Sequence, residues 1–303
     1  MKFAKWADRG NALHAESLEG SWARCVGASR LGSMESSGQQ RSVWMQMRGS
    51  SWIEAKEGRF FLSKGDWIAF AKDSGPIVQT DKGGVCIGLL VAEESIEAMS
   101  QLGEPTLHIG QGRLTPAEIR TTGRLWCQTA SHLSLGGVDR FPPSLRPLLL
   151  HIAGIQSPYA ALIGLCPGTS LRRKRQVFDR LQRAQLYLAG NCHRVVRMSE
   201  LAEKTTFSTW YLSKIFNRLY GQSPQTASAR MRLEQAANLL ASTNMAIAEV
   251  GVSSGFENNC SFARSFRARY GMTATTYRGI HRHRDQSRHM RPSHRVRPHA
   301  ITS

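Results

Sequence analysis

The sequence lacks cysteines at the spacings that bind metals or form redox pairs. Its six cysteines are scattered through 303 residues, with no C-x-x-C pair and no histidine at zinc-finger spacing. This distribution argues against a disulfide framework and against a structural zinc site. We therefore expect no metal or other cofactor, and we expect most of the thiols to be buried as small apolar side chains. The six are Cys25, Cys86, Cys127, Cys166, Cys192 and Cys260.

Long apolar runs and clustered metal ligands are missing too. No uninterrupted apolar run reaches the ~18 to 20 residues of a membrane span, and Met1–Asn11 lacks the apolar core of a signal peptide. The front half has only four histidines, far apart, without the His-x-His pair expected of a metal-dependent cupin enzyme. The sequence thus predicts a cytoplasmic protein that is not an enzyme and has no catalytic residues.

Acidic residues are scarce in the second half of the chain. Residues 1–170 hold 17 Lys and Arg against 15 Asp and Glu, whereas residues 171–303 hold 23 against 7, which gives the net charge of +18. This asymmetry indicates that only the back half meets a polyanion. Residues 281–303 hold six Arg and five His with almost nothing apolar. They are predicted to form a disordered tail that adds an electrostatic contact to DNA.

The basic half contains a repeat. A pattern of apolar anchors, with a small residue in a first helix, occurs twice about fifty residues apart. It predicts two helix-turn-helix units, in which a first helix (about 199–205 and 246–253) braces a second helix that enters the major groove of DNA. The expected core residues are Leu201, Ala202, Phe207, Leu212, Phe216, Val250, Gly251, Phe256, Phe262 and Phe266.

The opposite faces of the two second helices carry the predicted DNA contacts. Asparagine pairs with adenine and lysine or arginine with guanine, whereas the outer residues are expected to grip phosphates. The predicted base-reading residues are Trp210, Ser213, Lys214, Asn259, Cys260, Ala263 and Arg264. The predicted phosphate contacts are Thr209, Arg218, Asn258 and Arg267. For Trp210, contact with a sugar or a thymine methyl competes with partial burial, and the sequence leaves the choice open.

A single helix is expected to join the two units. Ser223 is its N-cap, Pro224 is its first residue, and it continues from Gln225 to Thr243. About twenty residues at 1.5 Å each span about 30 Å, close to the ~34 Å between successive major grooves on one face of DNA. One chain is therefore expected to read two adjacent grooves.

The front half has the pattern of short strands followed by helices. From Ser42 to Val91, apolar and polar residues alternate in runs broken by glycine, which predicts a small antiparallel sheet or barrel. Helices are expected after Thr115 and after Pro143. Interior positions of the barrel are expected to be filled by packing or to contact a ligand, and the sequence leaves both open. The candidates are Trp44, Trp52, Phe60, Phe61, Trp67 and Phe70.

Residues Arg175 to Arg278 resemble the DNA-binding domain of the AraC/XylS family of bacterial transcription regulators. In that family the positions matching the predicted base-reading residues lie on the groove-facing sides of the two helices. The resemblance covers about a third of the chain. It rests on Leu201-Ala202-Glu203, Tyr211-Leu212-Ser213-Lys214-Ile215-Phe216, Gly221-Gln222-Ser223-Pro224, Arg232-Leu233-Glu234-Gln235-Ala236, Ile247-Ala248-Glu249-Val250, Gly255-Phe256-Glu257-Asn258 and Ser261-Phe262-Ala263-Arg264-Ser265-Phe266.

The resemblance implies a division of the chain and a fold class, α+β. The front half is loosely similar to the family's variable N-terminal domain, often a cupin-like β-barrel followed by helices. The implied parts are a regulatory or dimerisation domain at 1–165 (β-rich at 42–91, helical at 115–165), a linker at 166–174, a double helix-turn-helix domain at 175–280 and the tail at 281–303.

The resemblance also implies a function, which is sequence-specific regulation of transcription at the bacterial nucleoid. Family members are more often activators, so promoter DNA and RNA polymerase are the implied partners. A small-molecule effector on the N-terminal domain stays open, and so does a homodimer formed through the apolar helices near Leu145 to Leu165. The alternative function is non-specific, architectural DNA binding.

Three positions depart from the family pattern. Thr206 stands where the first turn usually has glycine, which strains this turn if it needs a positive φ. Ala274 replaces a proline, a change that the fold should tolerate. Cys260 and Ala263 are poor hydrogen-bonding groups, so the second unit is expected to grip phosphates more than it reads bases.

Overall fold

The computed structural model describes residues 4–18, 21–36, 40–101, 106–133 and 143–289. Its contacts divide the chain into two compact units, each of which is described by itself below. The first unit consists of Met1–Asn191 and Val196–Ala227, and the second consists of Cys192–Val195 and Ser228–Ser303. The first helix-turn-helix unit thus shares a compact unit with the front half of the chain.

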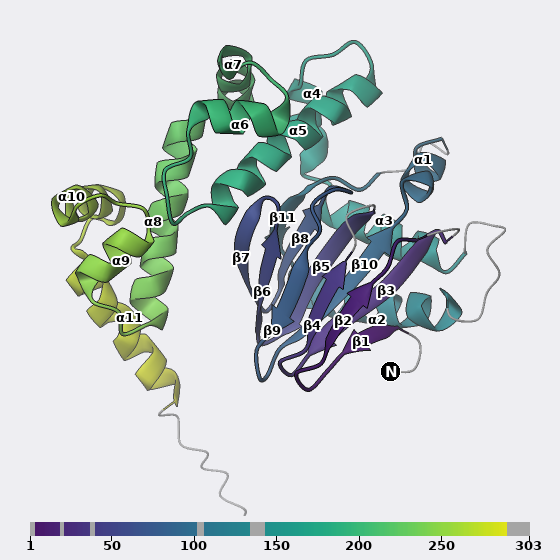
Figure 1. Cartoon of the computed structure of the whole chain (residues 1–303), viewed down its shortest axis with the longest axis horizontal. Coiled ribbons are helices and arrows are strands. Elements are labelled where there is room, and N and C mark those ends of the chain that lie inside the picture. The colour runs from purple at the N-terminus through teal and green to yellow at the C-terminus, as the bar shows by residue number, and fades with distance from the viewer. Residues whose placement is uncertain (1–3, 19–20, 37–39, 102–105, 134–142, 290–303) are drawn as a thin grey trace, which may run out of the picture. The chain divides into compact units, whose positions relative to one another are not determined.

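Two β-sheets form the front of the first unit (Figure 1). The six-stranded sheet has the order β1-β3-β10-β5-β8-β11, and the five-stranded sheet has the order β2-β4-β9-β6-β7. Neighbouring strands are antiparallel except for the pairs β1/β3 and β2/β4. The strands are β1 Lys5–Ala7, β2 Ala12–Ala15, β3 Ala23–Ser29, β4 Ser33–Ser36, β5 Arg41–Arg48, β6 Ser50–Ala55, β7 Gly58–Ser63, β8 Asp66–Phe70, β9 Ile77–Thr80, β10 Val85–Val91 and β11 Gly110–Arg113.

The six-stranded sheet is buried on both faces. One face packs on the five-stranded sheet through a core that includes Trp44, Phe70 and Met34. The other face packs on helices through a second core that includes Trp67, Trp126 and Leu149. The helices of this layer and its surroundings are α1 Glu93–Gln101, α2 Pro116–Leu133, α3 Leu145–Ile155 and α4 Tyr159–Leu165. The expected α+β class is confirmed, with two sheets followed by helices.

The structure corrects two details of the β prediction. The β-rich segment does not begin at Ser42, because strands β1 to β4 precede it. Trp52 and Phe61, which were candidates for the interior, are 46% and 52% exposed. They are cross-strand partners with ring centroids 5.1 Å apart. Their neighbours in sequence fill the core, namely Ile53, which was not a candidate, and Phe60, which was, because successive residues of a strand point to opposite faces.

Helix α5, Leu171–Gly190, begins inside the predicted linker, and Ser170 caps it by accepting a hydrogen bond from the Arg173 backbone N–H. The helix has buried residues on more than one side, among them Val177, Phe178 and Leu181. It packs on β7 and β11 as well as on α4 and α6, Met198–Thr205. α5 therefore belongs to the core of the front half and to the first helix-turn-helix unit at the same time.

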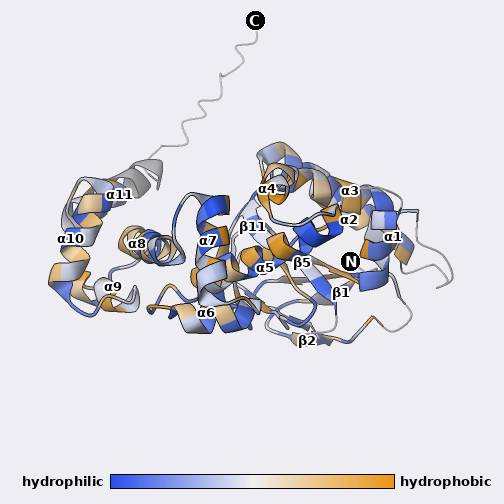
Figure 2. Cartoon of the chain, turned by 90° about the horizontal axis from the view of Figure 1, so that it is seen from above, coloured by the Kyte–Doolittle hydropathy of each residue, from blue (hydrophilic) through white to orange (hydrophobic). Residues whose placement is uncertain are grey.

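The rest of the first helix-turn-helix unit is α7, Thr209–Tyr220. Both α5 and α7 carry hydrophilic and hydrophobic residues along their length (Figure 2). Leu212, Ile215, Phe216 and Leu219 form the buried side of α7. These residues recur at helical spacing, as an amphipathic helix requires.

The second unit is built on the part of α8, Pro224–Ser242, that follows Ala227. α9 Ile247–Ser253, α10 Asn259–Tyr270 and α11 Ala274–His289 complete it. Its core joins Leu240, Val250, Phe262 and Phe266. α11 continues to His289, so the predicted disordered tail begins in a helix, and residues 290–303 lie outside the described residues.

Among the described residues, no single helix combines the length and the apolar composition needed to cross a membrane. Together, α3 and α4 meet that test as a pair bent by 67°. α3 nevertheless contributes Leu145, Leu148 and Ile152 to the core against the six-stranded sheet. Much of the apolar surface that suggested a dimer seam is thus used inside the chain.

Candidate DNA-binding surface

The first turn and its recognition helix are fixed by local hydrogen bonds. Thr206 ends α6 in the left-handed region, with φ 55°. The Ser208 hydroxyl then accepts a hydrogen bond from the Tyr211 backbone N–H at 3.2 Å, which caps α7. Gly221 ends α7, also in the left-handed region. The positive φ at Thr206 is the strained conformation that the absence of glycine predicts.

The predicted core residues of both helix-turn-helix units lie mostly inside. Leu201, Leu212 and Phe216 are at most 1% exposed in the first unit, and so are Phe262 and Phe266 in the second. Phe207 is half-buried and takes an edge contact from the Tyr211 ring at 5.3 Å. Four further predicted core residues are also buried, namely Ala202, Val250, Gly251 and Phe256.

The outer face of α7 carries the predicted groove contacts. Trp210 is 68% exposed, so it is not partly buried, and its contact with a sugar or a thymine methyl stays a prediction. The Lys214 ammonium lies 4.8 Å from the centroid of the Trp210 ring. This cation–π contact holds a positive charge over an exposed aromatic face. Ser213 is half-buried beside them, and Thr209 and Arg218 are exposed at the edges.

Asn217 was missed among the candidates, although it lies on the same face. It is exposed, and it follows Lys214 by three residues and Trp210 by seven. Residues three, four and seven apart share one side of a helix. The spacing alone was the signal that could have found it, since an asparagine on this face can pair with adenine.

The outer face of α10 is polar and open. Asn259, Cys260 and Arg264 are exposed. The side-chain oxygen of Asn258 accepts a hydrogen bond from the Ser261 backbone N–H at 2.8 Å, so this residue caps α10 while its amide N–H donors stay available to a phosphate. Also exposed on this helix are Ala263 and Arg267.

The two turns repeat one contact that the sequence pattern did not reveal. The Arg180 guanidinium lies 5.3 Å from the Phe207 ring centroid, and the Arg232 guanidinium lies 4.9 Å from that of Phe256. In both units an arginine from the preceding helix thus covers the turn phenylalanine. Arg232 also donates a hydrogen bond to the Gly255 carbonyl at 2.8 Å.

Ion pairs fix α5 to the front half within the first unit. Asp179 accepts a hydrogen bond from Arg41 at 3.3 Å and lies 3.0 Å from the His108 ring nitrogen Nδ1. One turn further on, Arg183 lies 3.1 Å from the buried Glu57 carboxylate. Ion pairs therefore join α5 to the β part of the first unit, and α5 packs on α6, the helix that contacts α7.

The class of protein follows from this geometry and from comparison with known proteins. Residues 201–280 match the family model described as a helix-turn-helix domain. The transcriptional activator AarP of Providencia stuartii is 25% identical over 93 residues, which are 31% of this chain and 69% of AarP. The uncharacterised regulator YobQ of Bacillus subtilis is 33% identical over 92 residues, which are 30% of this chain and 38% of YobQ.

A solved structure, a probable AraC family transcriptional regulator from Rhodopseudomonas palustris, is 28% identical. It covers 34% of this chain and 96% of its own, with a TM-score of 0.32. Because residues 201–280 match the helix-turn-helix family model, the back of the chain is a helix-turn-helix DNA-binding domain. More particularly, this domain is of the AraC type, as the sequence pattern predicts. YobQ is matched over less than half of its length, so the likeness concerns this domain and not whole proteins.

Proposed function

We propose that this protein is a sequence-specific transcription regulator that activates promoters by placing α7 and α10 in successive major grooves of DNA. The observation that carries the proposal is the exposed, cationic face of α7, where Lys214 lies over the open Trp210 ring. A large exposed indole is unusual on a protein surface, and here it stands beside a residue type that reads guanine. AarP, named an activator, supports the direction of regulation.

The front half is the proposed regulatory part. Its two sheets and helices suit the sensing domain that the family resemblance implies, and RNA polymerase is the proposed partner at the promoter. A small effector and a homodimer complete the proposal, with the protein acting at the nucleoid of a bacterial cell. α5 supports this arrangement, because its ion pairs with Glu57 and Arg41 connect the front half to the first recognition helix.

The test is a selection of random duplexes by the full chain at physiological salt. The full chain is needed because α5 packs on β7 and β11. Two enriched motifs one helical turn apart are the expected result. One motif alone means that α10 grips phosphates without reading bases, as the small groups at Cys260 and Ala263 favour. Tight binding without any enrichment would support the architectural function instead.

Variants then assign the base-reading roles. Lys214→Ala and Arg264→Ala are each expected to relax selectivity at defined base pairs, at about 1–3 kcal/mol per position. Lys82→Ala is the matched control, since Lys82 is exposed on the β9–β10 turn and the change removes the same charge. A loss of affinity that is equal on all duplexes would reject base reading by these two residues.

A further inference from the structure

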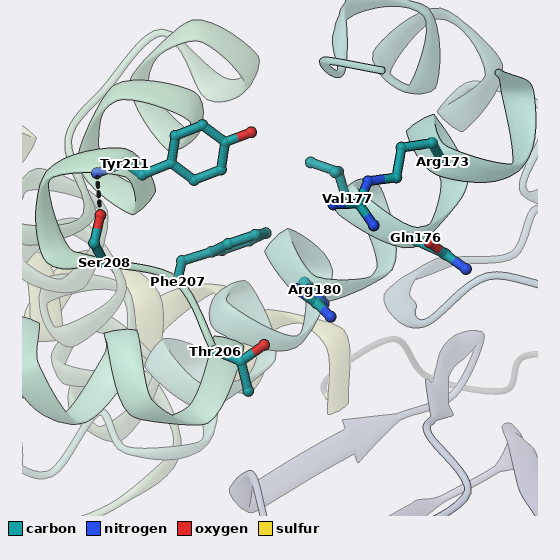
Figure 3. Close-up of a pocket in the computed structure, with 8 residues that line it drawn as sticks. All are labelled: Arg173, Gln176, Val177, Arg180, Thr206, Phe207, Ser208 and Tyr211. Atoms are coloured by element: carbon teal, nitrogen blue, oxygen red, sulfur yellow. Dashed lines mark hydrogen bonds between the residues drawn. The ribbon is translucent and has the colours of Figure 1, made fainter. Parts of the chain in front are cut away.

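A pocket of about 360 Å³ lies beside the N-terminal end of the first recognition helix (Figure 3). α5 forms one wall with Arg173, Gln176, Val177 and Arg180, and the turn and α7 form the other with Phe207 and Tyr211. In Figure 3 the Phe207 and Tyr211 side chains extend toward α5, and the Arg173 side chain extends from α5 toward them beside Val177. The pocket is thus a cationic hollow with an aromatic side, all of it within the first unit.

Some cations of α5 have partners on other elements, whereas the two that line the pocket have none among the described residues. Arg183 pairs with Glu57 and Asp73. Lys174 donates a hydrogen bond to the Gly164 carbonyl at 3.0 Å. On the pocket side, Arg173 and Arg180 are exposed and form no ion pair with any described residue. Two unpaired guanidiniums that share one hollow repel each other, so an anion placed between them would be stabilised.

The second helix-turn-helix unit offers an internal contrast. There Arg232 covers the turn phenylalanine as Arg180 does, but it donates a hydrogen bond to the Gly255 carbonyl. Seven residues before it stands Gln225, where the first unit has Arg173 seven residues before Arg180. At these two positions the second helix-turn-helix unit therefore has one arginine, held by a hydrogen bond, where the first has two that are not.

The position of the pocket identifies its ligand. Tyr211 follows Trp210 directly and lies seven residues before Arg218, so the pocket opens on the flank of α7 next to its groove face. Phosphates of the DNA backbone border a recognition helix on its flanks, and arginine binds phosphate with paired N–H donors. The first backbone N–H groups of α7 add favourable charge at the same end.

We propose that Arg173 and Arg180 hold one backbone phosphate of the DNA strand that borders the first major groove. α5 thereby contacts DNA from outside the helix pair that reads the bases. This inference rests on the proposed function, and it names a further contact for the same partner. It predicts that affinity, and not base preference, depends on the two arginines.

Full-length Arg173→Gln and Arg180→Gln are compared by fluorescence anisotropy on a selected and on a random duplex. Each is expected to weaken binding roughly tenfold on both duplexes. Each is also expected to lower the slope of log K against log salt by about 1. Arg172→Gln is the matched control, because Arg172 is exposed on the same turn of α5 and does not line the pocket. Losses no larger than the control's would overturn the proposal.

A second experiment locates the phosphate. Single neutral methylphosphonates are placed along the strands beside the first motif. One of them is expected to weaken wild-type binding, to weaken binding by Arg173→Gln less, and to have no further effect on the Arg173→Gln/Arg180→Gln double variant. Arg173 forms no side-chain hydrogen bond, ion pair or ring contact with a described residue, whereas loss of Arg180 also removes its contact with Phe207. An absence of any such position would overturn the proposal.

Inorganic phosphate tests the rival ligand, a free anion. A thermal shift by phosphate that Arg180→Gln abolishes, together with unchanged DNA affinity, would assign the pocket to a small anion and overturn the proposal. The random duplex separates this outcome from failure of the proposed function. If no duplex is enriched by the full chain, sequence-specific regulation fails, while the phosphate contact is still measured on random DNA.

Discussion

Thr206 and Gly255 occupy the same position in the two helix-turn-helix turns, and both have a left-handed backbone, with φ 55° and 74°. Each directly precedes the turn phenylalanine, Phe207 or Phe256. Glycine adopts this conformation freely, whereas a residue with a branched Cβ is strained there by roughly 1–2 kcal/mol. The first turn therefore holds strain that the second turn avoids.

Thr206→Gly is expected to stabilise the first unit by about 0.5–1 kcal/mol. Relief of the strain exceeds the extra entropy that glycine gives the unfolded chain. Urea unfolding followed by tryptophan fluorescence measures this, because all seven tryptophans lie in the first unit. A lower free energy of unfolding in Thr206→Gly would contradict the interpretation that the Thr206 backbone is strained.

Gly255→Ala is the matched control in the second turn, and it is expected to destabilise the protein. Its new Cβ would lie 2.9 Å from the Arg194 backbone, in addition to requiring a positive φ. Far-UV circular dichroism follows the loss, since the second unit is helical in its described residues. An unchanged stability would show that the backbone near Arg194 shifts at little cost to accommodate the new Cβ.

Cys260 offers a direct probe of the α10 face. Cys260 and Cys127 are the exposed cysteines among the described residues. Burial raises the pKa of Cys25, Cys86 and Cys192 to about 12, so these thiols are almost fully protonated at pH 8. Because the thiolate is the reactive form, N-ethylmaleimide is expected to label Cys127 and Cys260 first.

DNA is expected to protect Cys260 from this labelling and to leave Cys127 reactive. Mass spectrometry of the full chain, with and without a selected duplex, measures both sites in one sample. Cys127 on α2 is the internal control. Equal protection of both cysteines would mean that DNA changes the reactivity of the whole protein. Labelling of Cys260 that DNA does not slow would mean that this residue does not face the DNA groove.

The back half was more predictable from sequence than the front half, for physical reasons. Helix caps and periodic apolar residues are local signals, and Ser223 caps α8 as expected. The capping pair at Thr115 and Glu118 is equally local, and its two hydrogen bonds are present. Such short-range chemistry needs no knowledge of the rest of the chain.

Partners distant in sequence were not predictable in the same way. Strands β2 and β4 are short and pair in parallel, so neither an adjacent turn nor a long alternation marks them. In β6 both Trp52 and Ile53 are apolar, and alternation cannot tell which of them faces the core. α5 looked like part of the DNA-binding domain alone, because its contacts with β7 and β11 depend on residues more than fifty positions away.

Arg183→Ala is expected to destabilise the first unit by about 2–3 kcal/mol. Glu57 is 2% exposed, and its Oε1 lies 3.1 Å from Arg183 and accepts a hydrogen bond from Ser74. Removal of the arginine leaves a buried charge without its partner, which costs more than the pair contributes. It also frees Asp73: burial alone would raise the pKa of Asp73, but Arg183 holds it below its usual value.

A double-mutant cycle checks this interpretation. Glu57→Gln combined with Arg183→Ala is expected to lose less stability than the sum of the single changes, because the neutral amide no longer needs a counter-charge. Urea unfolding by tryptophan fluorescence supplies all four values. Strict additivity would mean that Arg183 acts through packing of its aliphatic part and not through Glu57.

His151 is expected to make the first unit sensitive to mild acid. Its Nε2 lies 2.9 Å from the Thr122 hydroxyl on α2, and burial lowers its pKa below the ordinary value of 6.5, although Glu118 opposes the shift. Between the lowered pKa and 6.5 the unfolded chain binds more protons than the folded one, so stability falls as pH drops through this window and then levels off. In His151→Gln, the free energy of unfolding should depend less on pH, while the amide keeps a hydrogen bond to Thr122. His132→Gln, which changes an exposed residue of α2, should leave the pH dependence of stability unchanged. Urea unfolding from pH 5 to pH 8 measures all three proteins, and an unaltered slope in His151→Gln would assign the acid sensitivity to another group.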